Sequence, residues 1–175
     1  MKKQKGFSLI ELLIVVAIIL IIAAIAIPNL LRSKIAANES SAVGSVRTIN
    51  TSEVTYQSSW GTGFAATLAN LGGPAPCLVA SGATACLLDP LLSQPPNTKS
   101  GYSFAALGGS LVGGVLNTFE VNATPLVVQT TGVRSFCADQ TGLIQFMANG
   151  VAIGTAPGAC SIVPNALPAS GPIGN

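Results

Sequence analysis

Few residues in this sequence could do chemistry, and a lone glutamate and four cysteines stand out among them. The chain has 175 residues, of which six are acidic, eight are basic and none is histidine. Histidine is the commonest general base and zinc ligand, and its absence removes the usual pH switch as well. Beyond the first third of the chain the carboxylates are widely spaced, at Asp89, Glu120 and Asp139. We therefore expect a protein that is not an enzyme and that needs no cofactor or metal.

The lone glutamate, Glu11, lies at the start of a long apolar run, Leu12 to Ile27. A carboxylate near the start of a membrane helix costs up to a few kcal/mol, which makes it a candidate functional residue. Either Glu11 lies near enough to the membrane surface to reach water, or it pairs with a cation. Cleavage of the chain after Gly6 would supply that cation, because it creates a positive amine on Phe7, one helical turn from Glu11.

The segment around Glu11 has the features of a membrane-targeted chain. Three lysines precede the apolar run, and a positive leader of this kind stays in the cytoplasm. As a helix, residues 7–27 would measure about 31 Å, which is enough to cross the hydrocarbon core of a membrane. Residues 23–26, Ala-Ala-Ile-Ala, also resemble a signal-peptidase site, so removal of the whole segment is the alternative. The length of the run favours its retention on the protein.

Residues 6–18, GFSLIELLIVVAI, followed by AAIAIP at 23–28, resemble the prepilin signature of type IV pilins and type II secretion pseudopilins. The resemblance implies cleavage between Gly6 and Phe7 by a prepilin peptidase, followed by N-methylation of Phe7. It also implies that Glu11 compensates the amine of a neighbouring subunit during assembly. Leu20 departs from the pattern, because many members of the family carry a helix-loosening glycine there.

The helix is expected to continue well beyond the apolar run. Pro28 ends that run and predicts a kink in the continuing helix. Six apolar residues then fall on one narrow stripe at helical spacing: Leu31, Ile35, Ala42, Val46, Ile49 and Tyr56. Glu53 falls on the same stripe, a mismatch that the sequence does not explain. Gly61 and Gly63 predict the end of the helix.

The remainder of the chain is predicted to be rich in β structure. A loop-like stretch at 61–100 contains a short turn at 86–92, and the last 20 residues form a surface tail. Strands are expected at 101–107, 117–122 and 125–130, with a hairpin between 133–138 and 143–147. This order of elements predicts an α+β fold, in which a long amino-terminal helix packs on a small antiparallel sheet.

The sequence therefore divides into four segments. They are a leader at 1–6, a transmembrane and assembly helix at 7–28, an amphipathic helix at 29–60, and a globular β-rich head with a carboxyl-terminal tail at 61–175.

The four cysteines fit two disulfides formed in an oxidising compartment. Three connectivities are possible, and the sequence alone excludes none of them. Cys77 and Cys86 bracket a single loop with a Ser-Gly centre, which favours their pairing. Cys137 lies in the predicted hairpin and Cys160 in the tail. Pairing these two would staple the tail across the sheet, as the carboxyl-terminal disulfide loop does in the pilins that this chain resembles.

The resemblance implies a structural subunit of a type IV pilus-like filament that serves adhesion, twitching motility or DNA uptake. The precursor would cross the inner membrane once, and the extracellular filament would be polymerised through the amino-terminal helix. Its partners would be identical or related pilin subunits, the prepilin peptidase and methylase, and the pilus assembly machinery.

Two alternatives to a pilin are a pseudopilin of a type II secretion system and a membrane-anchored binding module that does not polymerise. Major pseudopilins typically bind calcium through a carboxyl-terminal loop, whereas no carboxylate side chain follows Asp139 here, which favours the pilin. Five basic and six acidic residues remain when the three leader lysines are set aside, so we expect no nucleic-acid partner.

Overall fold

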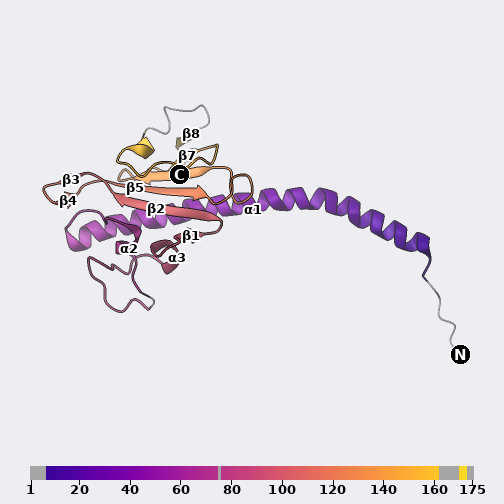
Figure 1. Cartoon of the computed structure of the whole chain (residues 1–175), viewed down its shortest axis with the longest axis horizontal. Helices are drawn as coiled ribbons and strands as arrows, with labels where there is room; N and C mark the ends of the chain where they lie inside the picture. Colours follow the sequence, from indigo (N-terminus) through magenta and orange to yellow (C-terminus); the bar gives the residue numbers. More distant parts are fainter. Residues whose placement is uncertain (1–6, 75, 162–169, 173–175) are drawn as a thin grey trace. The chain divides into compact units, whose positions relative to one another are not determined.

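The computed structural model describes residues 7–74, 76–161 and 170–172. Gly6, the leader lysines and much of the predicted tail lie outside the described residues. The chain falls into two compact units that divide between Lys34 and Ile35. One helix, α1 (Leu9–Trp60), contributes its first part to one unit and its second part to the other (Figure 1).

Helix α1 has 52 residues and continues through Pro28. Proline has no backbone N–H, so the carbonyl of Ala24 has no donor from four residues further along the helix. A kink at Pro28 remains a prediction. The helix ends at Trp60, as the glycines predict: Gly61 has φ +66°, and its N–H donates to the carbonyl of Gln57 at 3.0 Å. A positive φ is readily adopted by glycine, which explains why the helix stops here.

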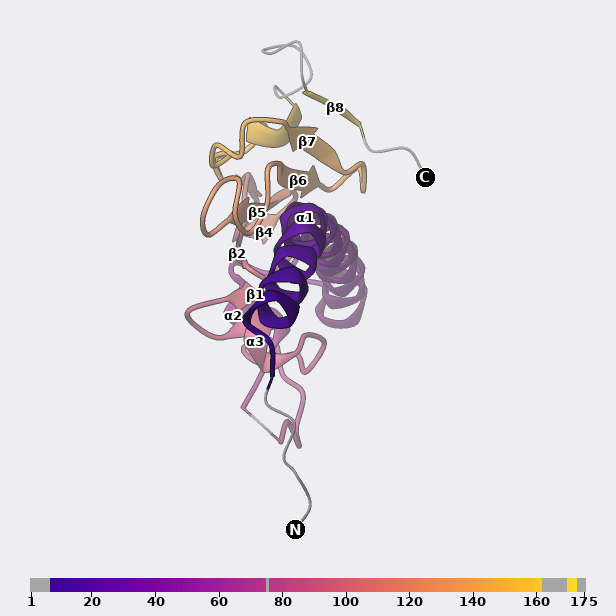
Figure 2. The ribbon, with the colours of Figure 1, turned by 90° about the vertical axis from the view of Figure 1, so that its right-hand side faces the viewer.

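The head contains a six-stranded antiparallel sheet, so the predicted α+β fold is confirmed. Figure 2 shows the strands following one another across the sheet. In spatial order they are β1 (Thr98–Lys99), β2 (Tyr102–Gly108), β5 (Phe119–Pro125), β6 (Ser135–Asp139), β7 (Gln145–Met147) and β8 (Ser170–Pro172). A separate small hairpin joins β3 (Leu111–Val112) and β4 (Val115–Leu116). Two short helices precede the sheet, α2 (Leu68–Leu71) and α3 (Pro90–Ser93).

One face of this sheet packs on the second part of α1 to form the core. Aromatic and small side chains alternate along the strands and meet the buried stripe of the helix. The main members of this cluster are Ala42, Val46, Ile49 and Tyr56 of α1 with Tyr102, Phe104, Ala106, Phe119, Val121, Ala123, Phe136 and Ala138 of the sheet. A smaller cluster of Cys137, Ile153 and Cys160 lies on the other face, where the segment 151–160 covers the sheet.

The strands predicted at 101–107 and 117–122 correspond to β2 and β5, and the predicted hairpin corresponds to β6 and β7. The strand predicted at 125–130 is wrong. Pro125 is the last residue of β5, and the chain then turns, because the N–H groups of Thr130 and Thr131 both donate to the carbonyl of Val127, at 3.1 and 2.9 Å. The β-branched residues of this segment were the misleading signal, since the backbone bonds within a turn rather than to a neighbouring strand.

Candidate functional site

The structure gives Glu11 a partner within its own chain. Its Oε2 accepts a hydrogen bond from the backbone N–H of Ser8 at 2.9 Å. Because α1 begins at Leu9, Ser8 precedes the first helical residue and Glu11 is the third, so this contact is one half of a capping box. This role was not among the predictions from the sequence, although Ser8-Leu9-Ile10-Glu11 matches the S-x-x-E pattern. The carboxylate also lies near the positive end of the helix dipole.

The first part of α1 exposes its apolar side chains along its whole length. The large side chains between Leu9 and Ile27 are 46 to 78% exposed, and Phe7 is 80% exposed. An 18-residue window of this helix reaches a mean hydropathy of 3.3, so by length and composition the helix could cross a membrane. Soluble proteins rarely expose an apolar surface of this extent. This part of the helix therefore needs a lipid or protein environment from outside the chain.

A second glutamate, Glu39, fixes α1 to the head. Its Oε1 accepts from the N–H groups of Val133 and Arg134, at 2.9 and 3.0 Å. Its Oε2 accepts from Nε and Nη2 of Arg134, at 2.9 and 2.7 Å. Burial opposes ionisation of Glu39, but these amides and the guanidinium outweigh it and hold the pKa of the carboxyl below its usual value. The guanidinium also lies over the rings of Phe136 and Phe146.

Glu53 is fully buried, which accounts for its place on the apolar stripe. Its Oε2 accepts from the N–H of Ala65 at 2.8 Å, where the chain returns after the glycine turn at Gly61 and Gly63. Its Oε1 has no hydrogen-bond partner among the described residues. Burial, only partly offset by the Ala65 amide, raises the pKa of Glu53 to about 7.

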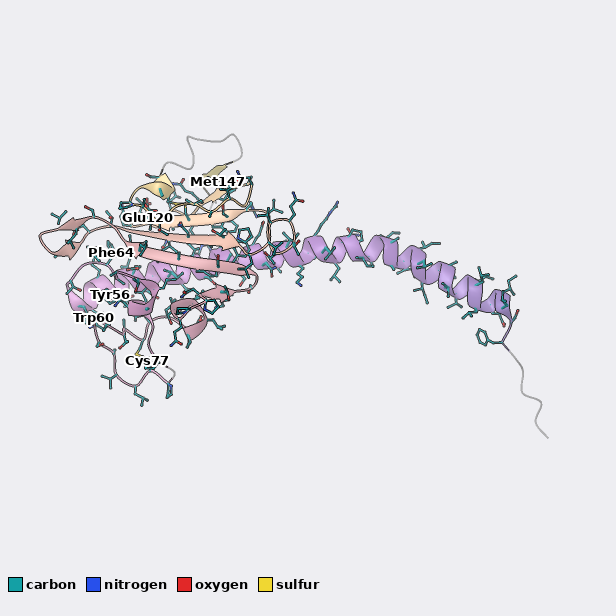
Figure 3. All side chains as sticks on the ribbon, viewed as in Figure 1. Tyr56, Trp60, Phe64, Cys77, Glu120 and Met147 are labelled. Atoms are coloured by element: carbon teal, nitrogen blue, oxygen red, sulfur yellow. A yellow bond between two sulfur atoms is a disulfide. The ribbon has the colours of Figure 1, made fainter. Side chains whose placement is uncertain are left out.

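A third buried carboxylate, Glu120, holds the carboxyl-terminal segment on the far face of the sheet (Figure 3). Its oxygens accept from the N–H groups of Gly158 and Cys160, at 2.6 and 3.2 Å. Asp139 lies directly opposite on β6. Burial raises the pKa of Glu120; the two amides oppose this shift, and the charge of Asp139 adds to it.

The cysteines pair as Cys77–Cys86 and Cys137–Cys160, with Cα–Cα distances of 5.7 and 5.6 Å. This is the connectivity that the sequence analysis favours. The second bond ties the carboxyl-terminal segment to β6 beside the Glu120 contacts. Within residues 7–74, 76–161 and 170–172, no three potential metal ligands gather in one place. The disulfides and the buried carboxylates thus join segments of the head that are separated in sequence.

The comparison with known proteins agrees with the features of the first unit. The prokaryotic N-terminal methylation motif matches residues 1–27. The amino-terminal segment is thus similar to that of prepilins, and its predicted resemblance to the type IV pilins is confirmed. Over 39 residues the chain is 62% identical to the type IV wide pilus major component PilA4 of Thermus thermophilus. That match covers 22% of this chain and 30% of PilA4. No solved structure matches the chain.

Proposed function

We propose that this protein is the structural, non-enzymatic subunit of a type IV pilus-like surface filament. The observation that carries the proposal is the methylation motif at residues 1–27, which includes the start of a helix with exposed apolar side chains. Lipid would cover this surface in a membrane-held precursor, and the helices of neighbouring subunits would cover it in the filament. The head (61–175) and the amphipathic part of the helix (29–60) would then lie outside the membrane.

Maturation would create the cation that Glu11 needs. Cleavage between Gly6 and Phe7 by a prepilin peptidase frees an amine, and methylation of that amine retains its positive charge. Ser8 uses Oε2 of Glu11 in the isolated subunit, which leaves Oε1 free to accept from the Phe7 amine of a neighbour. Glu11 would thus cap its own helix and compensate a neighbour at the same time. A kink at Pro28 would adjust the direction of the helix inside the filament.

The head has features that suit a surface exposed outside the cell. Two disulfides close its loops, and buried carboxylates tie α1 and the carboxyl-terminal segment to the sheet. Adhesion, twitching motility and DNA uptake are the roles open to such a filament. Its partners would be copies of itself or related pilins, the peptidase and methylase, and the assembly machinery.

A pseudopilin of a type II secretion system is the second candidate. Two observations favour the pilin. The residues after Asp139 contain no carboxylate side chain that could bind calcium. The matched relative, PilA4, is itself a component of a pilus.

Mass spectrometry of sheared surface filaments tests the proposal. We expect this chain as a filament component, beginning at a methylated Phe7. The variant Gly6→Val should accumulate in the membrane with its leader attached, because a branched side chain obstructs the cleavage site. Lys5→Ala is the matched control: it changes the leader but leaves the junction intact, and it should be processed normally.

Two outcomes would contradict the filament. A mature chain that begins at residue 25 or later would show that the apolar segment is an ordinary signal peptide. A chain correctly processed at Phe7 that stays in the membrane and never enters filaments would instead indicate the non-polymerising binding module.

A further inference from the structure

A hollow of about 260 Å³ lies where segment 152–155 crosses the sheet face that points away from α1. We call it the outer groove. Its lining comes from β2 (Ser103, Phe104 and Ala105), β5 (Asn122 and Thr124) and residues 152–155. Glu120, labelled in Figure 3, precedes Asn122 by two residues on β5 and therefore marks the same face of the sheet.

The outer groove contains a polar group without a partner. Asn122 is only 4% exposed, and its Nδ2 donates to the carbonyl of Ile153 at 2.6 Å. That bond fixes the orientation of the amide. Its Oδ1 is buried and accepts no hydrogen bond from the residues that the structure describes. A buried acceptor without a donor costs about 1–3 kcal/mol, so this position favours a molecule that brings a donor.

The other polar groups of the outer groove are hydroxyls. Ser103 donates to the carbonyl of Thr124 at 3.3 Å, which leaves the lone pairs of its oxygen free. The hydroxyls of Thr124 and Thr155 have no partner within the described part of the chain, and each can both donate and accept. No charged side chain lines the groove. The site therefore suits a neutral ligand rich in hydroxyl groups, and it offers an ion no countercharge.

The wall of the outer groove is held in place from several directions. Ser135 Oγ donates to the carbonyl of Val151 at 2.6 Å, and Asn122 holds Ile153. Beyond the groove, the Glu120 contacts and the Cys137–Cys160 bond fix the end of the segment. A wall that is already ordered loses little conformational entropy when a ligand binds.

We propose that the outer groove binds a neutral saccharide, one of whose hydroxyls donates to Oδ1 of Asn122 after a small movement of this side chain opens that buried oxygen to the groove. Its volume is below the range of about 300–1,000 Å³ usual for drug-sized ligands, which suits a single sugar ring. A second hollow of about 420 Å³ shares Phe104, Ala105 and Thr155 with the groove. It extends past Thr67 and Asn97, so a chain of two or three sugars can continue into it.

An extended peptide is a poorer match for this surface. Peptides that add to a sheet pair with the free backbone groups of an edge strand. The outer groove instead lies on the face of β2 and β5, where Ser103 pairs with Thr124 and Ala105 with Asn122. Only side chains and segment 152–155 are available for recognition there, and their hydroxyls and amide match those of a sugar.

The test uses the full chain, purified in a detergent without a sugar headgroup, so that the detergent does not compete. The probes are N-acetylchitotriose, maltotriose, mannotriose and lactose, with a sialylated lactose and an uncharged tetrapeptide for comparison. Binding is measured by saturation-transfer NMR and isothermal titration. We expect at least one of the four neutral saccharides to bind.

Substitutions then locate the site. Ala105 is exposed and its side chain lines the groove, so Ala105→Leu should fill the groove without touching the core and weaken binding at least roughly tenfold. Thr124→Val removes one hydroxyl at nearly constant volume and should weaken binding roughly threefold to tenfold. Ala80→Leu, which adds the same side chain at an exposed position in the Cys77–Cys86 loop, should leave affinity unchanged.

The proposal is overturned if no neutral saccharide binds or if Ala105→Leu binds as tightly as the unmodified chain. Preference for the sialylated sugar or the peptide would also overturn it. Intact disulfides and an unchanged unfolding midpoint must accompany each variant, so that misfolding is not read as lost binding. The measurement needs no filament and therefore fails or succeeds independently of the proposed assembly role.

Discussion

The two parts of α1, which divide between Lys34 and Ile35, differ in whether their apolar side chains are buried within the chain. The first part exposes large apolar side chains. The second part buries Ala42, Val46 and Ile49 completely against the sheet. Backbone hydrogen bonds form a helix equally well in both parts, because they are local. Burial is not local, and the first part depends for it on molecules outside the chain.

The three glutamates of α1 show the same contrast in their electrostatics. Glu11 is exposed and accepts from one backbone N–H at the start of its own helix. Glu39 is buried, and both of its oxygens accept hydrogen bonds, two of them from the Arg134 guanidinium. Glu53 is buried and, among the residues that the structure describes, has one amide donor and no cation beside it. The carboxylate of a glutamate on this helix can thus be exposed to a neighbouring subunit, paired with a cation, or buried without one. Which of these applies depends on the groups that the fold places beside it.

The largest effect should come from Glu11, where capping and charge can be separated. Glu11→Ala removes both, and we expect it to reduce filament yield more than roughly tenfold while membrane insertion continues. Glu11→Gln retains an acceptor for the Ser8 N–H but carries no charge. If charge compensation between neighbouring subunits matters, Glu11→Gln should reduce filament yield as much as Glu11→Ala. Normal assembly of Glu11→Gln would show that capping is the whole role of the residue.

The disulfides should contribute most to the stability of the head itself. Chain-entropy arguments give a loss of roughly 3.4 kcal/mol for removing the bond that spans 23 residues and roughly 2.6 kcal/mol for the bond that spans 9. The double variants Cys137→Ser/Cys160→Ser and Cys77→Ser/Cys86→Ser are compared by urea unfolding in detergent, followed through the fluorescence of Trp60. Trp60 is the single tryptophan and packs on the core. Equal or reversed losses would contradict this ranking.

Removing the charge of Glu53 should stabilise the head at pH 8. The pKa is raised from 4.5 to about 7 by burial, so the ionised form costs the folded state up to about 3 kcal/mol above pH 7. As the pH falls from 7 towards 4.5, the folded state takes up the proton first and this cost disappears. Glu53→Gln should therefore be more stable than the unmodified chain at pH 8, and the difference should shrink towards pH 5. A constant difference across this range would contradict the assignment.

Arg134→Ala should lower the free energy of unfolding by about 2 kcal/mol, which is less than the effects above. The reason is that Glu39 retains two amide donors. Its pH dependence should have the opposite sign. Because the pKa of Glu39 is lowered, its stabilisation is present above the usual carboxyl pKa and is lost as the pH falls through the lowered value. Arg134→Ala should weaken this loss in urea titrations between pH 6 and 3. Lys99→Ala is the control, since its ion pair with Asp89 is partly exposed and should matter little.

The sequence predicts those parts of the molecule whose causes are local. Helical spacing and Gly61 give the extent and the end of α1, and alternation with Gly-rich turns gives β2 and β5. A short loop favours the Cys77–Cys86 pair. The methylation motif is predictable for the same reason, because it is one contiguous stretch of residues.

The remaining features depend on contacts between distant residues. Glu53 can lie on an apolar stripe because the chain folds back after α1 and the N–H of Ala65 donates to its carboxylate. No residue near Glu53 in the sequence indicates this hydrogen bond. Arg134 meets Glu39 across 95 positions of sequence. The segment 125–130 has strand-forming residues, but Pro125 and the turn at Val127 take its backbone out of the sheet. The groove beside Asn122 requires the position of segment 152–155, which is set by the disulfide and by Glu120.

The contacts of that last segment also set an order for biosynthesis. The ribosome makes Gly158, Cys160 and β8 after every other element of the sheet, and a domain generally folds as a unit. Until those residues appear, Glu120 and Asp139 face each other without the amides, Cys137 carries a free thiol and β7 presents an open edge. The nascent head thus lacks these native contacts until synthesis is nearly complete.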